Sequence, residues 1–458
     1  MYLRLLMLSG AALTLSACGA MNSRYERPAI ATPATWNHEE QSATIAAAGP
    51  WWAAFNDAHL NALVEEVLNR NPNLAAATIR VRRAQLQAGL TRNNQIPQLS
   101  ASGSASGSRP LDGGSTTESY RVGASVSYEV DLWNRLGNLT NAAQWEALAT
   151  NEDRDATRLS LIGTAATLYF QSAYLKDRLA YTDQSIEVSR QTLRLIEAQY
   201  SAGATSGLEV AEARQSLEAQ LASRTQLVQQ QVENANAITV LLDGETAQPY
   251  GGATLAGVTI PAVEAGIPAS LLGRRPDLRA AELRLRSSLA NVDAASAAFY
   301  PTLSLSGDAG GSSSALSRLL SDPIGTLAAS ITLPFLNYER LRLNRDISRA
   351  DYDTAIATFR ENVRTALADV DNALSNNQQL AQQGERLEQA LASARTAERL
   401  YEVRYRAGAV PLRDWLNAQE RRRSAETALL ENRYARLGNH VTLLQALGGD
   451  PAPDPTAQ

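Results

Sequence analysis

Apolar residues recur at spacings of three and four along residues 338–407. This stretch has no proline and a single glycine, Gly384. The pattern predicts one amphipathic helix, roughly 105 Å long at ~1.5 Å per residue. Such a rod cannot fold back into a compact domain, so it must lie against similar rods. The apolar stripe comprises Tyr352, Ile356, Phe359, Val363, Leu367, Val370 and Leu374.

A second stretch, residues 138–202, also lacks proline and contains only one glycine, Gly163. It ends in Tyr200-Ser201-Ala202-Gly203, about 205 residues before Tyr405-Arg406-Ala407-Gly408. Strand entries share almost the same offset, as in Pro97-Gln98-Leu99-Ser100 and Pro301-Thr302-Leu303-Ser304. Because helix ends and strand entries hold one offset, the sequence predicts a single unit used twice, over residues 51–250 and 251–449.

Each predicted repeat contains a long helix followed by a shorter returning helix. The pairs are residues 134–202 with 207–243, and residues 338–407 with 411–447. The returning helices are roughly half as long as the long ones at ~1.5 Å per residue. Residues 450–458 are predicted to be a flexible C-terminal tail.

Between the helices the hydrophobic period changes to two. Four segments alternate apolar and polar residues: 97–108, 119–132, 301–311 and 324–335. Strands of this length with one apolar and one polar face have the pattern of transmembrane barrel strands. Four strands cannot close a barrel and an open edge is not tolerated in lipid, so several chains are expected to share one barrel. A sandwich of two ordinary sheets is the alternative.

The first 17 residues predict a secretory signal, because Arg4 precedes an apolar run that ends in Leu15-Ser16-Ala17-Cys18. Small residues before the only cysteine resemble a bacterial lipoprotein signal, in which Cys18 becomes the lipid-bearing N-terminus. Gly19, where inner-membrane retention signals commonly show Asp, favours the outer membrane. An ordinary cleavage site with a free thiol is the alternative. Residues 18–50 are predicted to be a lipidated tether or a wrapping strand.

Composition argues against several other functions. The formal net charge of -5 and the absence of a basic stripe disfavour nucleic acid as a partner. The three histidines, His38, His59 and His440, are scattered and have no metal-ligand spacing. One cysteine cannot form a disulfide within the chain. No enzymatic activity, metal or cofactor is expected, apart from the covalent lipid on Cys18.

Several motifs together resemble one family over nearly the whole chain. They are Tyr25-Glu26-Arg27-Pro28, Trp51-Trp52, Arg274-Arg275-Pro276-Asp277-Leu278, Phe299-Tyr300-Pro301 and the paired Tyr-x-Ala-Gly helix ends. The combination resembles the TolC-type outer membrane factors, in particular the OprM/NodT-like lipoprotein branch that serves resistance-nodulation-division (RND) efflux pumps. The resemblance implies an α+β membrane protein: a homotrimer with a 12-stranded transmembrane β-barrel that continues into a long periplasmic α-helical barrel.

The function implied by this resemblance is a passive exit duct for drugs and other small molecules. Its expected location is the bacterial outer membrane, with a lipid anchor and an extension into the periplasm. The implied partners are a periplasmic adaptor (membrane fusion) protein and an inner-membrane RND-type transporter. A similar duct for type I protein secretion and a non-pore periplasmic coiled-coil lipoprotein are the alternatives.

The resemblance also implies two sites near the helix ends. The residues implied at a periplasmic gate are Glu209, Asp414, Tyr405, Arg413 and Asn417, with Tyr405 as a latch partner for Glu209. Three copies would crowd six carboxylates around one aperture, which favours cations. The residues implied at adaptor-docking tips are Gly203, Ala204, Gly408 and Ala409. Helix capping is the alternative role for the glycines, and capping or simple exposure to water the alternative for Asp414.

Overall fold

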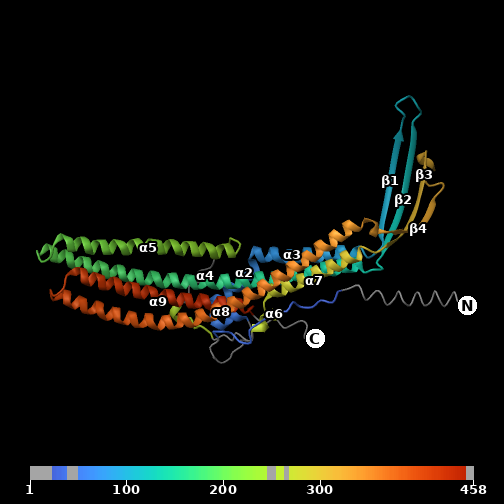
Figure 1. Cartoon of the computed structure of the whole chain (residues 1–458). Coiled ribbons are helices and arrows are strands. Elements are labelled where there is room, and N and C mark those ends of the chain that lie inside the picture. Colours follow the sequence, from blue (N-terminus) through green and yellow to red (C-terminus); the bar gives the residue numbers. More distant parts are fainter. Residues whose placement is uncertain (1–22, 39–49, 245–253, 262–267, 450–458) are drawn as a thin grey trace. The chain divides into compact units, whose positions relative to one another are not determined.

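The structure is a computed structural model of the chain (Figure 1). It describes residues 23–38, 50–244, 254–261 and 268–449. The chain divides into two compact units, which are described separately. The first unit comprises residues up to 30, 78–153 and 277–362, and the second comprises residues 31–77, 154–276 and those from 363 onward. Cys18 and the predicted C-terminal tail lie outside the described residues.

Two long helices, α4 (Arg135–Ser201) and α8 (Tyr338–Arg406), run through both units. In the second unit, α5 (Gly207–Leu241) lies along α4 and α9 (Leu412–Ala446) lies along α8 (Figure 1). An equivalent hydrogen bond joins the helices in each of these two pairs. The Asn234 side chain donates to the Leu168 carbonyl at 3.2 Å, and the Asn439 side chain donates to the Ala373 carbonyl at 2.9 Å. Donor and acceptor both shift by 205 residues (439 − 234 and 373 − 168).

The first unit contains one antiparallel sheet with the strand order β1-β2-β3-β4 (Figure 1). The strands are β1 (Gln98–Ser108), β2 (Thr117–Val130), β3 (Thr302–Ser313) and β4 (Ile324–Thr332). The sequence pattern predicts a fourth strand that reaches residue 335, but β4 ends at Thr332. The prediction was wrong there because Pro334 has no N–H to donate to a ladder and instead begins the short helix η5 (Pro334–Asn337).

The remaining elements are shorter helices. They are η1 (Trp51–Phe55), α2 (Ala58–Arg70), α3 (Pro72–Asn93), η2 (Leu255–Gly257), η3 (Pro268–Ser270), α6 (Leu271–Arg274), α7 (Pro276–Ala297) and η4 (Leu316–Arg318). Pro72 and Pro276 occupy first helical positions, where a missing N–H leaves no bond unmade. Over the described part of the chain, no helix is long and apolar enough to cross a membrane.

The core of the second unit forms where η1 and α2 pack against α4. Leu60, Leu63 and Phe170 are fully buried there. The Tyr169 hydroxyl donates to the Asp57 carboxylate at 2.6 Å, and Asp57 also caps α2 through the His59 backbone N–H. Burial, helped by this bond, raises the pKa of Tyr169 well above its usual range. The start of α2 is thereby tied to the middle of α4.

In the first unit, α7 packs against the first part of α4. The Ser287 hydroxyl donates to the Ala142 carbonyl at 2.9 Å, and Arg279 pairs with Glu152 at 2.7 Å. The N-terminal segment lies along α7. Its contacts are Ser23 with Asp293 (backbone N–H 2.9 Å, hydroxyl 2.6 Å) and Arg27 with Glu282 at 2.7 Å. Residues 23–27 of the predicted tether are therefore fixed to a helix.

Candidate functional site

Both long helices end in the same backbone turn. The second-to-last residue of each turn is a glycine in the left-handed region, with φ of +75° at Gly203 and +73° at Gly408. Side-chain-bearing residues rarely adopt this conformation. A Cβ on either glycine would meet no atom within 4 Å, so the turn requires the backbone freedom of glycine rather than its small size. The closing bonds run from Ala204 N to Gln199 O at 2.8 Å and from Ala409 N to Arg404 O at 2.9 Å.

These turns are Schellman caps, so the capping role proposed for the glycines does operate. All four tip residues, Gly203, Ala204, Gly408 and Ala409, are also exposed. Because the caps satisfy the helix-terminal carbonyls internally, the outer surface of each turn remains available to another protein.

An apolar cluster joins the ends of the two helical hairpins within the second unit. Its buried members are Ile196, Ala213, Leu412 and Trp415. The ring of Tyr405 stacks on Trp415 with 5.4 Å between centroids and 25° between planes. The four helix ends α4, α5, α8 and α9 therefore meet around one small core.

Glu209 lies in the first turn of α5 and is held there by its own helix. It forms a capping box with Ser206, whose backbone N–H donates to the Glu209 carboxylate at 3.1 Å. The Ser206 hydroxyl bond, with backbone N–H groups, lowers the pKa of Glu209 below its usual value. Glu209 therefore stays ionised at neutral pH.

The predicted latch between Tyr405 and Glu209 is not formed within this chain. The Tyr405 hydroxyl instead donates to the Gln199 side chain at 2.7 Å. Burial raises the pKa of Tyr405, and the charge of Glu209 raises it further, so the two groups interact only electrostatically. The sequence did not point to Gln199, because its contact depends on how α4 is rotated against α8.

Asp414 occupies the position equivalent to Glu209, 205 residues later, in the first turn of α9. Its environment differs because Pro411 stands where the first hairpin has Ser206. Proline has no side-chain acceptor, and α9 has no side-chain cap, so Asp414 does not cap the helix. Asp414 is partly buried, and the helix dipole favours a negative charge at this position. Arg413, one residue before it, and Asn417, three residues after it, are exposed.

A buried ion cluster between α8 and α9 was not predicted from the sequence. Arg422 pairs with Glu398 and with Glu426, at 2.6 Å to the latter, and Arg395 reaches Glu426 at 3.1 Å. The side chains of Arg422 and Glu426 are only 13% and 8% exposed. Burial raises the pKa of Glu398, and the charge of Arg422 opposes the rise. Only the Arg422–Glu426 spacing of four was visible in the sequence; the partner on α8 was not.

No group of three or more His, Cys, Asp or Glu within the described ranges could hold a metal ion. The hairpin ends combine two capped glycine turns, two equivalent acids and an aromatic pair.

Comparison with known proteins identifies the family. The family model "Outer membrane efflux protein" matches residues 63–244 and again residues 267–449, which confirms the predicted internal repeat. The pyoverdine export outer membrane protein OpmQ of Pseudomonas putida is 33% identical over 92% of this chain and 92% of its own length. The cation efflux system protein CusC of Escherichia coli K12 is 30% identical over 96% of this chain and 97% of its own.

Solved structures agree with this assignment. The outer membrane channel MtrE of Neisseria gonorrhoeae, in its open state, superposes with a TM-score of 0.85 at 29% identity, over 94% of this chain and 99% of that chain. The predicted TolC-like fold is thus confirmed, with long helices and four strands in each chain. This chain belongs to the outer membrane efflux protein family.

Proposed function

We propose that three copies of the chain form the outer membrane channel of a tripartite efflux pump. In this proposal, a periplasmic adaptor protein connects the channel to an inner-membrane RND-type transporter, which supplies the energy. The channel itself conducts drugs and other small molecules passively. The names of the two relatives, one for export of pyoverdine and one for efflux of cations, support small-molecule export.

The open sheet is the observation on which the proposal depends. Within the described residues, β1 and β4 each pair on one side only. Their apolar face is uncovered, with Leu99 84% and Leu327 91% exposed. Unpaired backbone groups are costly in lipid, whereas three copies of the four-stranded sheet make twelve strands, enough to close a barrel.

Aromatic residues at the helix-proximal ends of the strands support a membrane position. Trp133 stacks on Tyr300 with 4.8 Å between ring centroids, and its indole N–H donates to the Pro301 carbonyl at 2.8 Å. Phe299 packs edge-on against Tyr338 at 6.0 Å. Trp and Tyr prefer the level of the lipid head groups, where an apolar ring and a polar tip are both accommodated.

The hairpin ends are proposed as the periplasmic gate and the adaptor-docking tips. Glu209 and Asp414 from three chains would crowd six carboxylates around the entrance, with Tyr405, Arg413 and Asn417 beside them. The exposed Gly203-Ala204 and Gly408-Ala409 turns would let an adaptor backbone approach closely. The Asp414 side chain makes no capping bond, so it can change its conformation more easily than the Glu209 side chain.

The fixed N-terminal segment supports lipid attachment at Cys18. Ser23, which is bound to Asp293, follows Cys18 by five residues, a chain length of at most about 18 Å. Asp293 is four residues from Ala297, the end of α7, and α7 leads into β3. A lipid on Cys18 would therefore enter the membrane close to the strands.

Single-channel conductance in planar bilayers tests the proposal. Wild type is expected to run as a trimer in mild detergent and to give a small, cation-preferring conductance. Replacing both acids (Glu209→Ala with Asp414→Ala) should raise the conductance or weaken the cation preference, because the repulsion and the field at the entrance are removed. Glu218→Ala, which removes an exposed acid further along α5, should change neither. A monomer that forms no pore at any voltage would overturn the proposal.

A further inference from the structure

The sheet carries few charged side chains. Strands β1 and β4 have none; β2 has Glu118, Arg121 and Glu129, and β3 has Asp308. Successive side chains of a strand point to opposite faces. Glu118 therefore shares the apolar face with Val122 and Val126, and the other three charges lie on the polar face. In a membrane channel the apolar face meets lipid and the polar face lines the pore.

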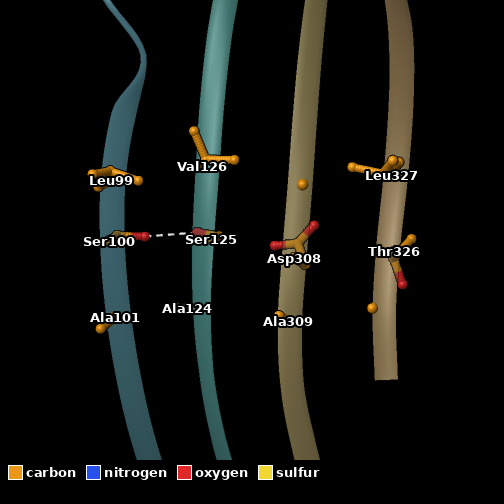
Figure 2. Close-up of a pocket in the computed structure, with 12 residues that line it drawn as sticks. Leu99, Ser100, Ala101, Ala124, Ser125, Val126, Asp308, Ala309, Thr326 and Leu327 are labelled. Carbon is orange, nitrogen blue, oxygen red and sulfur yellow. Dashed lines mark hydrogen bonds between the residues drawn. The ribbon is translucent and has the colours of Figure 1, made fainter. Parts of the chain in front are cut away.

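Asp308 lies in a row of hydroxyl side chains that crosses the whole sheet. Ser125 pairs with Ser100 on one side and with Asp308 on the other, and Asp308 pairs with Thr326. Figure 2 shows these four residues side by side on the four strands, with the hydrogen bond between the Ser100 and Ser125 hydroxyls. That bond is 2.7 Å long. Each chain therefore contributes one carboxylate to this level.

The next row on the same face, toward the strand turns, has side chains only on the two outer strands, from Ser102 and Ile324. Gly123 pairs there with Gly310, so the two central strands have no side chains in that row. A Cβ built on Gly310 would collide with the backbone of Val122, and this close approach explains why the position is glycine. Ions or cargo passing this level would meet the Asp308 carboxylate without an intervening side chain from β2 or β3.

The other polar-face charges are either paired or lie nearer the strand turns than Asp308 does. Glu129 pairs with Arg135 at 2.7 Å. Arg121 pairs with Ser312 on β3. The last pair between β3 and β4 is Gly310–Ile324, so β4 does not reach the level of Arg121. Arg121 lies four residues along the strands from the row of Asp308, roughly 13 Å away, which exceeds the ~8 Å screening length of physiological salt. No donor among the described residues reaches the Asp308 carboxylate.

We propose that Asp308 sets the charge selectivity of the strand-lined part of the channel. Three copies place three carboxylates at one level, where they attract cations, including protonated amines, and repel anions. This inference rests on the proposed trimeric channel, but it concerns a level separate from the acids at the helical entrance. Asp308 thus acts on cargo after it has passed the gate.

The test measures the ratio of K⁺ to Cl⁻ permeability from reversal potentials in a KCl gradient. The background is the Glu209→Ala, Asp414→Ala trimer, so that the entrance acids do not determine the result. Asp308→Asn is expected to lower the permeability ratio by about threefold or more, and Asp308→Lys to reverse the preference toward Cl⁻. Block by the trivalent cation hexaamminecobalt, added on the side of the strand turns, should be lost in Asp308→Asn.

Glu118→Gln is the matched control, because it removes the same charge from the opposite face of the sheet. Asp308→Ser provides a second neutral variant that keeps the hydroxyl character of the row. If trimers of Asp308→Asn and Asp308→Ser keep the parent permeability ratio, or if Glu118→Gln lowers it equally, the inference is wrong. A wild type that forms no pore would instead remove the proposed channel, and the inference with it.

Discussion

His440 is a buried histidine that the proposed function does not use. Its side chain is only 3% exposed and its ring packs edge-on against Phe55 at 5.3 Å. Its Nε2 atom has no hydrogen-bond partner among the described residues. Because burial disfavours the charged imidazolium, the pKa of His440 falls to about 4.

This depressed pKa predicts a loss of stability in acid. Between pH 6.5 and about 4 the unfolded chain binds a proton that the folded chain does not, so stability falls as pH falls through this window. At pH 5 the loss from His440 is about 2 kcal/mol per chain relative to pH 7.5. Thermal unfolding of wild type and His440→Leu at both pH values should show a smaller acid shift in the variant.

The exposed His59 supplies the control for this measurement. Replacing it, as His59→Gln, should leave the wild-type acid shift intact. Equal acid shifts in wild type and His440→Leu would contradict the buried, neutral state of His440.

At the scale of elements, the Schellman turns predict a position-dependent effect of adding a methyl group. Gly203→Ala and Gly408→Ala must place a side chain in the left-handed region, which costs roughly 1–2 kcal/mol per turn. The expected result is faster hydrogen exchange of the amides in the last turn of α4 or α8, because the ends of these helices open more easily.

Gly207→Ala is the matched control for the turn variants. Gly207 begins α5 only four residues after Gly203, has no positive φ, and has no atom within 4 Å of an added Cβ. Alanine should therefore be neutral or slightly protective there. Similar exchange rates in all three variants would show that the left-handed conformation does not hold the hairpin ends.

The elements also show what the sequence could and could not predict. The helices α4 and α8 end at Ser201 and Arg406, one residue before the predicted ends, because periodicity and the Tyr-x-Ala-Gly sequence act locally. The strand faces likewise follow from a period of two. By contrast, the partner of Tyr405 depends on the rotation of one helix against another, and no local pattern records that rotation.

The two repeats differ where capping chemistry differs. Ser206 in the first hairpin and Pro411 in the second are 205 residues apart, yet only Ser206 offers a side-chain acceptor to its helix. The Glu209 side chain is therefore held in a capping box, whereas the equivalent Asp414 side chain is not. The sequence repeat predicted equivalent positions for the two acids, but the change from serine to proline at the N-cap gives them different hydrogen bonds.

At the scale of the whole molecule, the first unit has apolar helix faces that it does not cover itself. On α3, Ile79 is 67% and Leu86 is 66% exposed. On α8, Leu343 is 51% and Ile347 is 58% exposed. Their spacings of seven and four place each pair on one face of its helix. Uncovered stripes of this kind are typical of contacts between protein chains, which agrees with a sheet that needs other copies to close.

If these apolar faces join the copies of the chain, a charge introduced into either face should prevent trimer assembly. Leu86→Asp and Ile347→Asp would each place a carboxylate in a contact between copies, where an unpaired charge is strongly unfavourable, so both variants should lose the trimer. Light scattering after size-exclusion chromatography in mild detergent measures the mass. Gln85→Asp adds the same charge at an exposed polar position one residue away and should remain trimeric. Trimers of unchanged mass in both stripe variants would mean that these faces do not join the copies, and that the sheets must be held together elsewhere.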